Sequence, residues 1–254
     1  MAPTPNAAAT HAPRRIVAAY GLLAVLIALM GGGAVQAQSL MVIPVNVQLP
    51  TGQKATTVTV SNHGTTDTAI QIRAYAWNQQ TGTDELVDSD AVLVSPPLAS
   101  IAAGATQVVR LILRQTPQGK EATYRIVVDQ IPPPAEPGVV HIVLRMSIPI
   151  FAQPTGRTSA HLKFRIERDG DSAFLVASND GGRHEVVRDV VLLTADGRKL
   201  TTPSNTSPYI LAGSTRRWPI TAQGTLPQAG ETLRITTHAD SGVIEQQVPV
   251  VSLP

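Results

Sequence analysis

Apolar and polar residues alternate along much of the chain, which is typical of β-strands with one buried face. Val58-Thr59-Val60, Ile70-Gln71-Ile72-Arg73-Ala74 and Val108-Val109-Arg110-Leu111 each place apolar side chains on one side of an extended backbone. Beyond the first 37 residues, no stretch longer than a turn or two carries an apolar stripe at helical spacing. The pattern therefore predicts an all-β protein.

Turn residues separate these segments at short and regular intervals. They are Asn62-His63-Gly64, Gln79-Gln80-Thr81-Gly82, Ala103-Gly104 and Pro117-Gln118-Gly119. Short strands at this spacing indicate an antiparallel sandwich with Greek-key connections.

A second set of strand-like segments follows Gln153-Pro154-Thr155-Gly156, whose proline and glycine suit a linker. Pro249, inside the last of these segments, favours an edge position, because proline donates no hydrogen bond to a neighbouring strand. We therefore predict two β-sandwiches, over residues 38–153 and 157–254, joined by a short hinge. The segments of the second set are Leu162–Ile166, Phe174–Val176, Val190–Leu193, Leu233–Ile235 and Val248–Val251.

The first 37 residues have the pattern of a secretory signal. Arg14 and Arg15 precede an apolar run from Ile16 to Met30, and Val35-Gln36-Ala37 supplies small residues for cleavage. This run of 15 residues is shorter than the roughly 20 that span a bilayer. We expect a signal peptide over 1–37, cut after Ala37, export to the periplasm, and no stable membrane insertion. An uncleaved anchor is the alternative.

Removal of this segment changes the charge balance. It holds two of the 20 basic residues and none of the 18 acidic ones, so the rest of the chain has no formal net charge. No block of lysines or arginines remains, and we expect no nucleic-acid partner. The sequence contains no cysteine, which excludes disulfides, cysteine nucleophiles and zinc–thiolate sites.

Motifs of known catalytic sites are absent from the sequence. It has no Gly-x-Ser-x-Gly, no His-Glu-x-x-His and no phosphate-binding glycine loop. His141 and His161 stand alone in strand-like contexts. Asp84, Glu85, Asp88 and Asp90 could bind calcium, but their spacing is not that of a calcium loop, and a solvated hairpin is favoured. We expect no enzyme activity, no cofactor and no metal.

Several segments together resemble the PapD-like periplasmic chaperones of the chaperone–usher pathway. The similarity covers most of residues 40–155 in the family's order and is looser in 178–184 and 209–218. The segment from Arg145 to Phe151 is similar to the branch that serves spore-coat-U-like, Csu-type (archaic) pili. The resembling segments are Gln53–Asn62, Ser95-Pro96-Pro97, Ala103-Gly104-Ala105, Gln107–Arg110, Tyr124–Val127, Ile131-Pro132-Pro133 and Val140–Phe151.

This resemblance implies two immunoglobulin-like domains in a boomerang arrangement and a strand donated to pilus subunits. Val140, Ile142 and Leu144, in the segment 139–145, match the donated residues that would fill the subunit's open groove. The alternative, which a β-strand taken alone favours, is that these three side chains face the domain's own core. Each buried aliphatic side chain contributes roughly 1.5–3 kcal/mol.

The resemblance also implies basic residues that hold the subunit's C-terminal carboxylate. The arginine and lysine expected there fall at Asn46 and Pro149. Their absence favours the archaic branch or a diverged chaperone with weaker anchoring. We expect Arg125 to replace these basic residues, with Arg145 next; Arg110 and Arg73 are further options. A solvated surface charge is the alternative for each.

The implied partners are pilus or fimbrial subunits and an outer-membrane usher. Whether the free protein caps its donor edge by self-association is left open by the sequence. The alternative function is a secreted two-domain adhesin or a pilus structural subunit. A subunit would polymerise, whereas a chaperone would form soluble one-to-one complexes.

Overall fold

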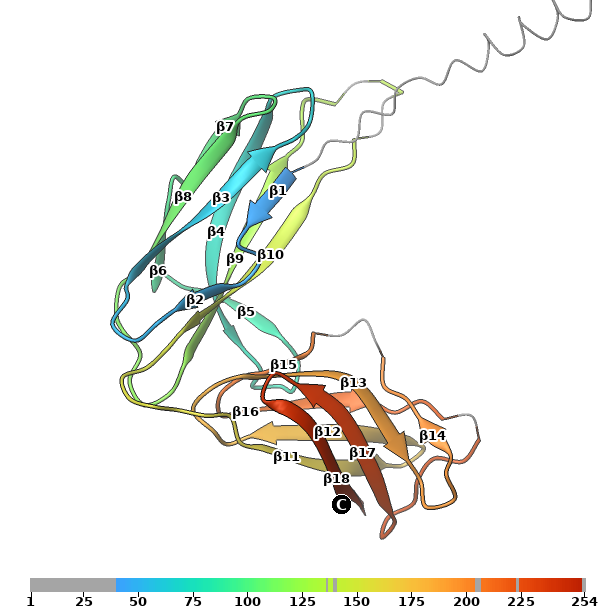
Figure 1. Ribbon diagram of the computed structural model, residues 1–254. Helices are drawn as coiled ribbons and strands as arrows, with labels where there is room; N and C mark the ends of the chain where they lie inside the picture. The colour runs from blue at the N-terminus through green and yellow to red at the C-terminus, as the bar shows by residue number, and fades with distance from the viewer. Residues whose placement is uncertain (1–39, 136, 139–140, 204–206, 223, 253–254) are drawn as a thin grey trace, which may run out of the picture. The chain divides into compact units, whose positions relative to one another are not determined.

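The computed structural model describes residues 40–135, 137–138, 141–203, 207–222 and 224–252. The predicted signal peptide, residues 1–37, lies outside these residues. The described residues form strands and turns without any α-helix, as Figure 1 shows. No helix in this part of the chain could cross a membrane. The prediction of an all-β protein is confirmed.

The N-terminal sandwich consists of two sheets. One has the order β1-β3-β8-β6, and the other has the order β2-β10-β9-β4-β5, with β7 paired to β4. The first sheet contains β1 (Leu40–Ile43), β3 (Ala55–Asn62), β8 (Thr106–Leu113) and β6 (Val92–Ser95). The second contains β2 (Val47–Leu49), β10 (Arg145–Ala152), β9 (Ala122–Ile131), β4 (Thr68–Asn78), β5 (Glu85–Asp88) and β7 (Leu98–Ile101).

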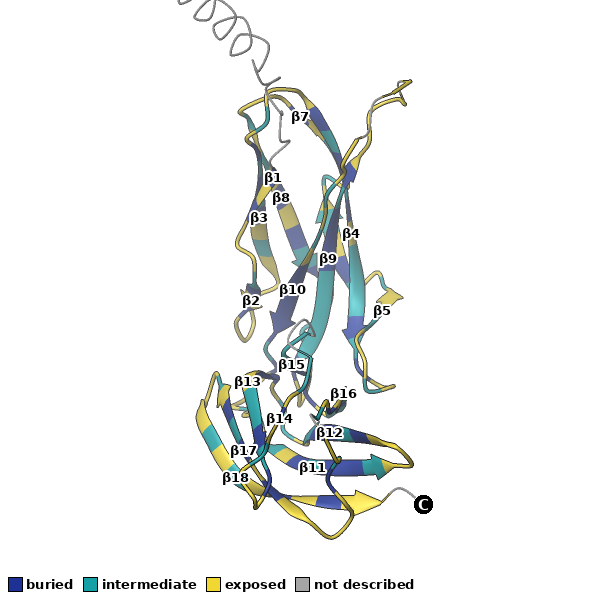
Figure 2. Cartoon of the chain, turned by 90° about the vertical axis from the view of Figure 1, so that its right-hand side faces the viewer, coloured by how far each residue is buried: buried dark blue, intermediate teal, exposed yellow. Residues whose placement is uncertain are grey.

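Alternation along the strands places one set of side chains between these sheets. In β3, Val58 and Val60 are buried while Thr57 is exposed and Thr59 half-buried. The same alternation buries Ile70 and Ile72 in β4, and Figure 2 shows buried and exposed positions alternating along the strands. The apolar side chains from both sheets form a single core.

The chain changes sheets soon after it enters this sandwich. Leu40–Ile43 pair with β3, and after Pro44 the chain crosses so that Val47–Leu49 run parallel to the end of β10. The short β2 therefore covers only one end of β10.

The C-terminal strands form one curled sheet in the order β14-β13-β17-β18-β11-β12-β16, with β15 paired to β13. Side chains from β11, β13, β17 and β18 share one core, so the sheet folds over itself into a sandwich. The strands are β11 (Leu162–Asp169), β12 (Ser172–Asn179), β13 (Glu185–Leu193), β14 (Lys199–Leu200), β15 (Tyr209–Ile210), β16 (Ser214–Pro219), β17 (Thr232–Ala239) and β18 (Gly242–Ser252).

The predicted edge position of Pro249 is wrong, because β18 lies between β17 and β11. Pro249 is paired to Thr232 of β17, whereas pairing to β11 begins only at Val250. The residue that lacks an N–H therefore precedes the point where the second neighbour joins, which lets an interior strand tolerate it.

Candidate functional site

Strand β10 is paired along one side only for half of its length. β9 borders it from Arg145 to Ala152, but β2 borders only Ile150 to Ala152. Among the described strands, none pairs with Arg145–Pro149 on the second side (Figure 1). The N-terminal half of β10 is thus a sheet edge.

The hydrogen-bond pattern identifies which backbone groups this edge presents. The Gln130 N–H donates to the Leu144 carbonyl at 2.9 Å. Every second residue from Leu144 onward, which we call in phase with Leu144, therefore directs its backbone hydrogen bonds to β9. Residues out of phase, Arg145 and Ser147, turn their N–H and C=O groups to the opposite side. Pro149 adds a carbonyl but no N–H. The edge can therefore pair with another extended chain.

The side chains in phase with Leu144 face the core of the N-terminal sandwich. Ile148 and Ile150 are buried, and Met146 and Leu144 pack partly against that core. Ile142 continues the alternation but is 80% exposed, and residues 141–144 are not assigned to a strand. Val140 lies outside the described residues.

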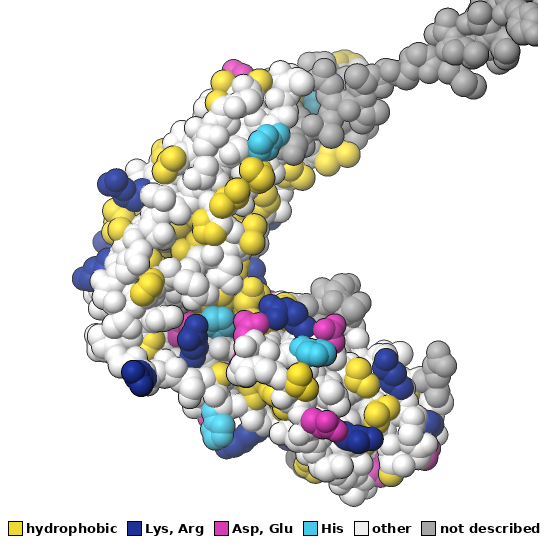
Figure 3. All heavy atoms as spheres, viewed as in Figure 1, with side chains coloured by type: hydrophobic (Ala, Val, Ile, Leu, Met, Phe, Trp, Pro, Cys, Tyr) yellow, Lys and Arg dark blue, Asp and Glu magenta, His cyan; other side chains and the backbone are white. Residues whose placement is uncertain are grey.

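Other exposed apolar side chains lie around this part of the sandwich. Met41, Ile43 and Val45 are 41%, 55% and 75% exposed, and Val143, beside Ile142, is 45% exposed. Figure 3 shows apolar side chains gathered on the face of the sandwich that includes β1 and β10. A soluble protein normally protects a sheet edge with such apolar flanks, so this edge has the features of a binding surface.

Arg125 projects from β9 beside this edge. Its guanidinium carbon lies 3.9 Å from the centre of the Trp77 ring and 5.9 Å from that of Tyr209, and Nη1 reaches Ser147 Oγ at 3.4 Å. Burial lowers the pKa of Arg125, and the nearby charge of Asp84 partly offsets this effect. No carboxylate of the described residues lies within ion-pair distance of Arg125. The aromatic rings thus hold a cation that can accept an anionic partner.

Asn46 and Pro149, which stand where the resemblance expects an arginine and a lysine, lie near Arg125 in the sheet. Pro149 is its direct partner across β10 and β9. Asn46 immediately precedes Val47, which pairs with Ile150, the residue after Pro149. Opposed residues on neighbouring strands share a face of the sheet about 5 Å apart. Arg125 therefore lies one strand away from the place where the sequence resemblance expects the lysine.

The other arginine candidates have different surroundings. Arg145 and Arg73 both bind Asp129, Arg73 at 2.6 Å. Arg110 is exposed in the other sheet, between Thr57 and Ser95. Arg125 is thus the candidate with an aromatic support and without a carboxylate partner among the described residues.

The residues that join the two sandwiches next to Arg125 were not predicted from the sequence. Trp77 and Phe151 pack with Leu211 and Tyr209 of the C-terminal part. The alternation of Tyr75 and Trp77 along β4 was a signal for aromatic side chains on this face, but it did not indicate their partner.

A buried carboxylate lies next to this aromatic cluster. Glu121 Oε2 accepts hydrogen bonds from His184 N at 2.9 Å and Nδ1 at 2.6 Å, and the His184 ring stacks on Phe151 with 3.6 Å between centres. The Glu121 side chain is fully buried. This arrangement ties the start of β9 to the turn before β13.

The residues considered for metal binding or catalysis do not converge. Asp84 binds Arg216 at 2.9 Å and Gln79 at 2.8 Å, and His161 pairs with Asp180 at the surface. Among the described residues, no three histidine or acidic side chains are grouped to hold a metal ion. The expectations of no metal and no cofactor stay predictions.

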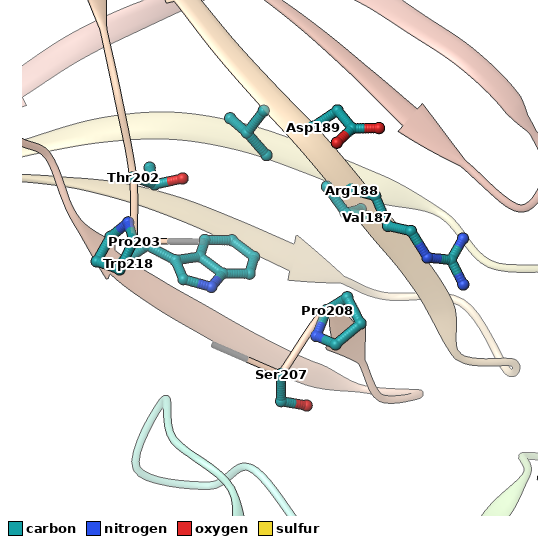
Figure 4. A pocket seen from close by; sticks show the side chains of 9 residues that line it. Val187, Arg188, Asp189, Thr202, Pro203, Ser207, Pro208 and Trp218 are labelled. Atoms are coloured by element: carbon teal, nitrogen blue, oxygen red, sulfur yellow. The ribbon is translucent and has the colours of Figure 1, made fainter. Parts of the chain in front are cut away.

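A separate hollow of about 410 Å³ lies in the C-terminal sandwich. Figure 4 shows Trp218 beside Pro203, with Ser207 and Pro208 across from it. Arg188 at its rim is paired with Asp240 at 2.8 Å. The loop between Pro203 and Ser207 is outside the described residues, and the described residues that line the hollow do not form a catalytic group.

Comparison with known structures identifies the fold class. Over 85% of this chain and 100% of the other, it is similar to a chain of the CsuC–CsuE chaperone–tip adhesion subunit complex of Acinetobacter baumannii, with a TM-score of 0.62 and 23% identity. The Class 5 fimbriae chaperone CfaA matches with a TM-score of 0.53 and 16% identity, over 85% of this chain and 100% of its own. The fold is that of two-domain, immunoglobulin-like chaperones of pilus systems.

The sequence comparisons indicate a similar family of chaperones. Residues 39–158 match the family described as "Pili and flagellar-assembly chaperone, PapD N-terminal domain". This segment, a little under half of the chain, is thus similar to the N-terminal domain of the PapD-like chaperones. It is also 28% identical over 128 residues to the chaperone protein FimB/FhaD of Bordetella pertussis, in a match covering 46% of this chain and 52% of the relative. The match therefore spans about half the length of that curated relative.

Proposed function

We propose that this protein is a periplasmic chaperone that captures pilus subunits by lending them a β-strand and delivers them to an outer-membrane usher. The observation that carries the proposal is the unpaired edge of β10, from Arg145 to Pro149, continued by the exposed Ile142. A subunit with an open groove would pair its backbone with this edge and bury alternate apolar side chains. Val140, Ile142 and Leu144 are the proposed donor residues.

Arg125 is the proposed anchor for the subunit's C-terminal carboxylate. It lies opposite Pro149 in the sheet and is supported by Trp77. A carboxylate next to this half-buried guanidinium would form a charge-assisted hydrogen bond. Arg145 is the second candidate, although it already binds Asp129.

We further propose that the chain belongs to the archaic branch of these chaperones. The replacement of both usual anchors by Asn46 and Pro149 supports this assignment. A chaperone complex from archaic Csu pili is among the solved structures that share this fold.

The alternative of an adhesin or pilus subunit is less well supported. The family model that residues 39–158 match describes pili and flagellar-assembly chaperones, which favours a chaperone. Strand exchange at an usher needs no nucleotide, so the proposed function requires neither catalysis nor a cofactor.

Co-purification tests the proposal directly. The tagged protein is expressed in the periplasm with the pilin-like subunit encoded nearest to it, as wild type, as Ile142→Asp and as Val243→Asp. Val243 is an equally suitable control because it is a 64% exposed apolar residue of β18. We expect a one-to-one complex with wild type and Val243→Asp, and its loss with Ile142→Asp. A complex that survives Ile142→Asp would place the binding edge elsewhere, and no complex at all would contradict the chaperone function.

A further inference from the structure

One carboxylate joins three strands at the point where the donor segment leaves the sheet. Asp129 of β9 accepts hydrogen bonds from Arg73 Nη2 of β4, at 2.6 Å, and from Nε of Arg145, the first residue of β10. The carboxylate is only 15% exposed, whereas the two arginines are 43% and 70% exposed. Asp129 also lies directly opposite Arg145 in the strand register.

The next residue of β9 holds the backbone of the donor segment. The Gln130 N–H donates to the Leu144 carbonyl at 2.9 Å, and its side-chain Oε1 accepts the Leu144 N–H at 3.2 Å. Residues 141–144 are not assigned to a strand, and β10 begins at Arg145. Gln130 therefore binds Leu144, the last residue before β10, and Asp129 binds Arg145, the first residue within it.

Apart from Leu144, which packs partly against the core, little apolar packing would hold this point in place without these polar contacts. A hollow of about 460 Å³ lies beside it, lined by Arg73, Asp129, Val143, Leu144 and Arg145 among others. Val143 is 45% and Ile142 80% exposed. Because few apolar contacts restrain the segment, its direction depends on the hydrogen bonds to Asp129 and Gln130.

We propose that Asp129 is a positioning residue for strand donation. Its carboxylate binds Arg145 and Arg73 together and so sets the point at which residues 141–144 leave the sheet. A segment that is already positioned loses less conformational entropy when a partner strand binds. The inference rests on the proposed function, since it assigns a role within the same site. It also gives Arg145 a role other than binding the subunit's carboxylate.

The test uses Asp129→Asn, which keeps the shape of the side chain and removes its charge. The matched control is Asp90→Asn, because Asp90 pairs with Arg114 on the same sandwich but is 86% exposed with 3.7 Å between the charged atoms. Subunit affinity is measured together with amide hydrogen exchange of the free protein. We expect Asp129→Asn to weaken capture about tenfold and to accelerate exchange at residues 144–146 but not in β3 or β8, while Asp90→Asn changes neither. Asp129→Glu should restore both readouts in part.

Three results would overturn the inference. Capture by Asp129→Asn equal to wild type would show that the ion pairs do not position the segment. Weaker capture with unchanged exchange at residues 144–146 would indicate direct contact with the subunit. Faster exchange throughout β3 and β8 would indicate general destabilisation. If the wild type captures no subunit, the proposed function fails. Exchange at residues 144–146 in Asp129→Asn then still decides whether Asp129 positions this segment.

Discussion

At the scale of single residues, two buried asparagines perform the same task in the two sandwiches. Asn62 Nδ2 donates to the carbonyls of Thr66 and Ile101, and Asn179 Nδ2 donates to those of Arg183 and Ile210. Each side-chain oxygen also accepts the N–H of the glycine two residues later. Both side chains therefore fasten a turn to a neighbouring loop or strand from inside the protein.

We predict that Asn62→Ala and Asn179→Ala each lower the free energy of unfolding by about 2–3 kcal/mol, because buried carbonyls lose their donors. Urea unfolding monitored by circular dichroism measures the change. Asn46→Ala is the control, since Asn46 accepts one bond from Gln48 at the surface and its loss should have little effect. Equal stability of all three variants would contradict the prediction.

Arg125 is the second residue with a specific expectation. Arg125→Ala should weaken binding of the subunit about tenfold or more, because a charge-assisted hydrogen bond contributes about 1.5–3 kcal/mol. Arg125→Lys should retain part of the affinity through its charge. Titration of the purified chaperone with a peptide of the subunit's C-terminus measures both.

The control for this measurement is Arg114→Ala, which removes a half-exposed arginine from the same sandwich. If Arg125→Ala binds the peptide as well as wild type does, the carboxylate is anchored elsewhere, and Arg145 becomes the first candidate.

At the scale of elements, the ion pairs of Asp129 connect β4, β9 and β10. Burial acts to raise the pKa of Asp129, but the hydrogen bonds from Arg145 and Arg73 outweigh it, and the pKa lies below its ordinary value. The native state therefore binds this proton less tightly than the unfolded state does. The resulting stabilisation is present above the unfolded pKa and is lost as the pH falls through the native pKa.

We predict that Asp129→Asn is less stable than wild type at neutral pH and that this difference shrinks on acidification below about pH 4. Urea unfolding of both proteins at several pH values measures it. A difference that stays constant or grows as the pH falls would show that the ion pairs do not stabilise the native sheet.

At the scale of the whole molecule, buried polar contacts link the two sandwiches. Glu121 binds His184, and Gln79 donates to the Tyr209 carbonyl at 2.9 Å and accepts the Leu211 N–H at 3.0 Å. The aromatic cluster around Trp77 lies between these contacts. Because the end of β10 contributes Phe151 to that cluster, the proposed donor strand and the link between the sandwiches are parts of one continuous element.

We predict that Glu121→Ala reduces the coupling of the sandwiches, since the His184 N–H would lose its buried acceptor at a cost of about 1–3 kcal/mol. Differential scanning calorimetry should show a lower and broader transition, or two transitions, for this variant. Glu231→Ala, at an exposed turn, should unfold as wild type does. Identical transitions for both variants would show that Glu121 does not couple the sandwiches.

The sequence by itself determined the class of fold and the faces of its strands. Alternation at Val58-Thr59-Val60 and at Ile70-Gln71-Ile72 was enough to predict β3 and β4 and their buried sides. Such a pattern is local, because successive side chains of a strand point to opposite faces whatever the strand pairs with. The donor residues were predicted from family resemblance, and they remain a prediction.

Only the tertiary structure decided which strand edge stays open and which charges meet. Val47 and Ile150 pair although about a hundred residues separate them, and this pairing ends just where the free edge of β10 begins. Likewise, Asp129 meets Arg73, and Arg125 meets Trp77, through strand register. Periodicity defines the face of a strand but carries no information on its neighbour. The missing N–H of Pro249 likewise indicated a residue without a partner on one side, but not that β11 joins β18 from the next residue onward.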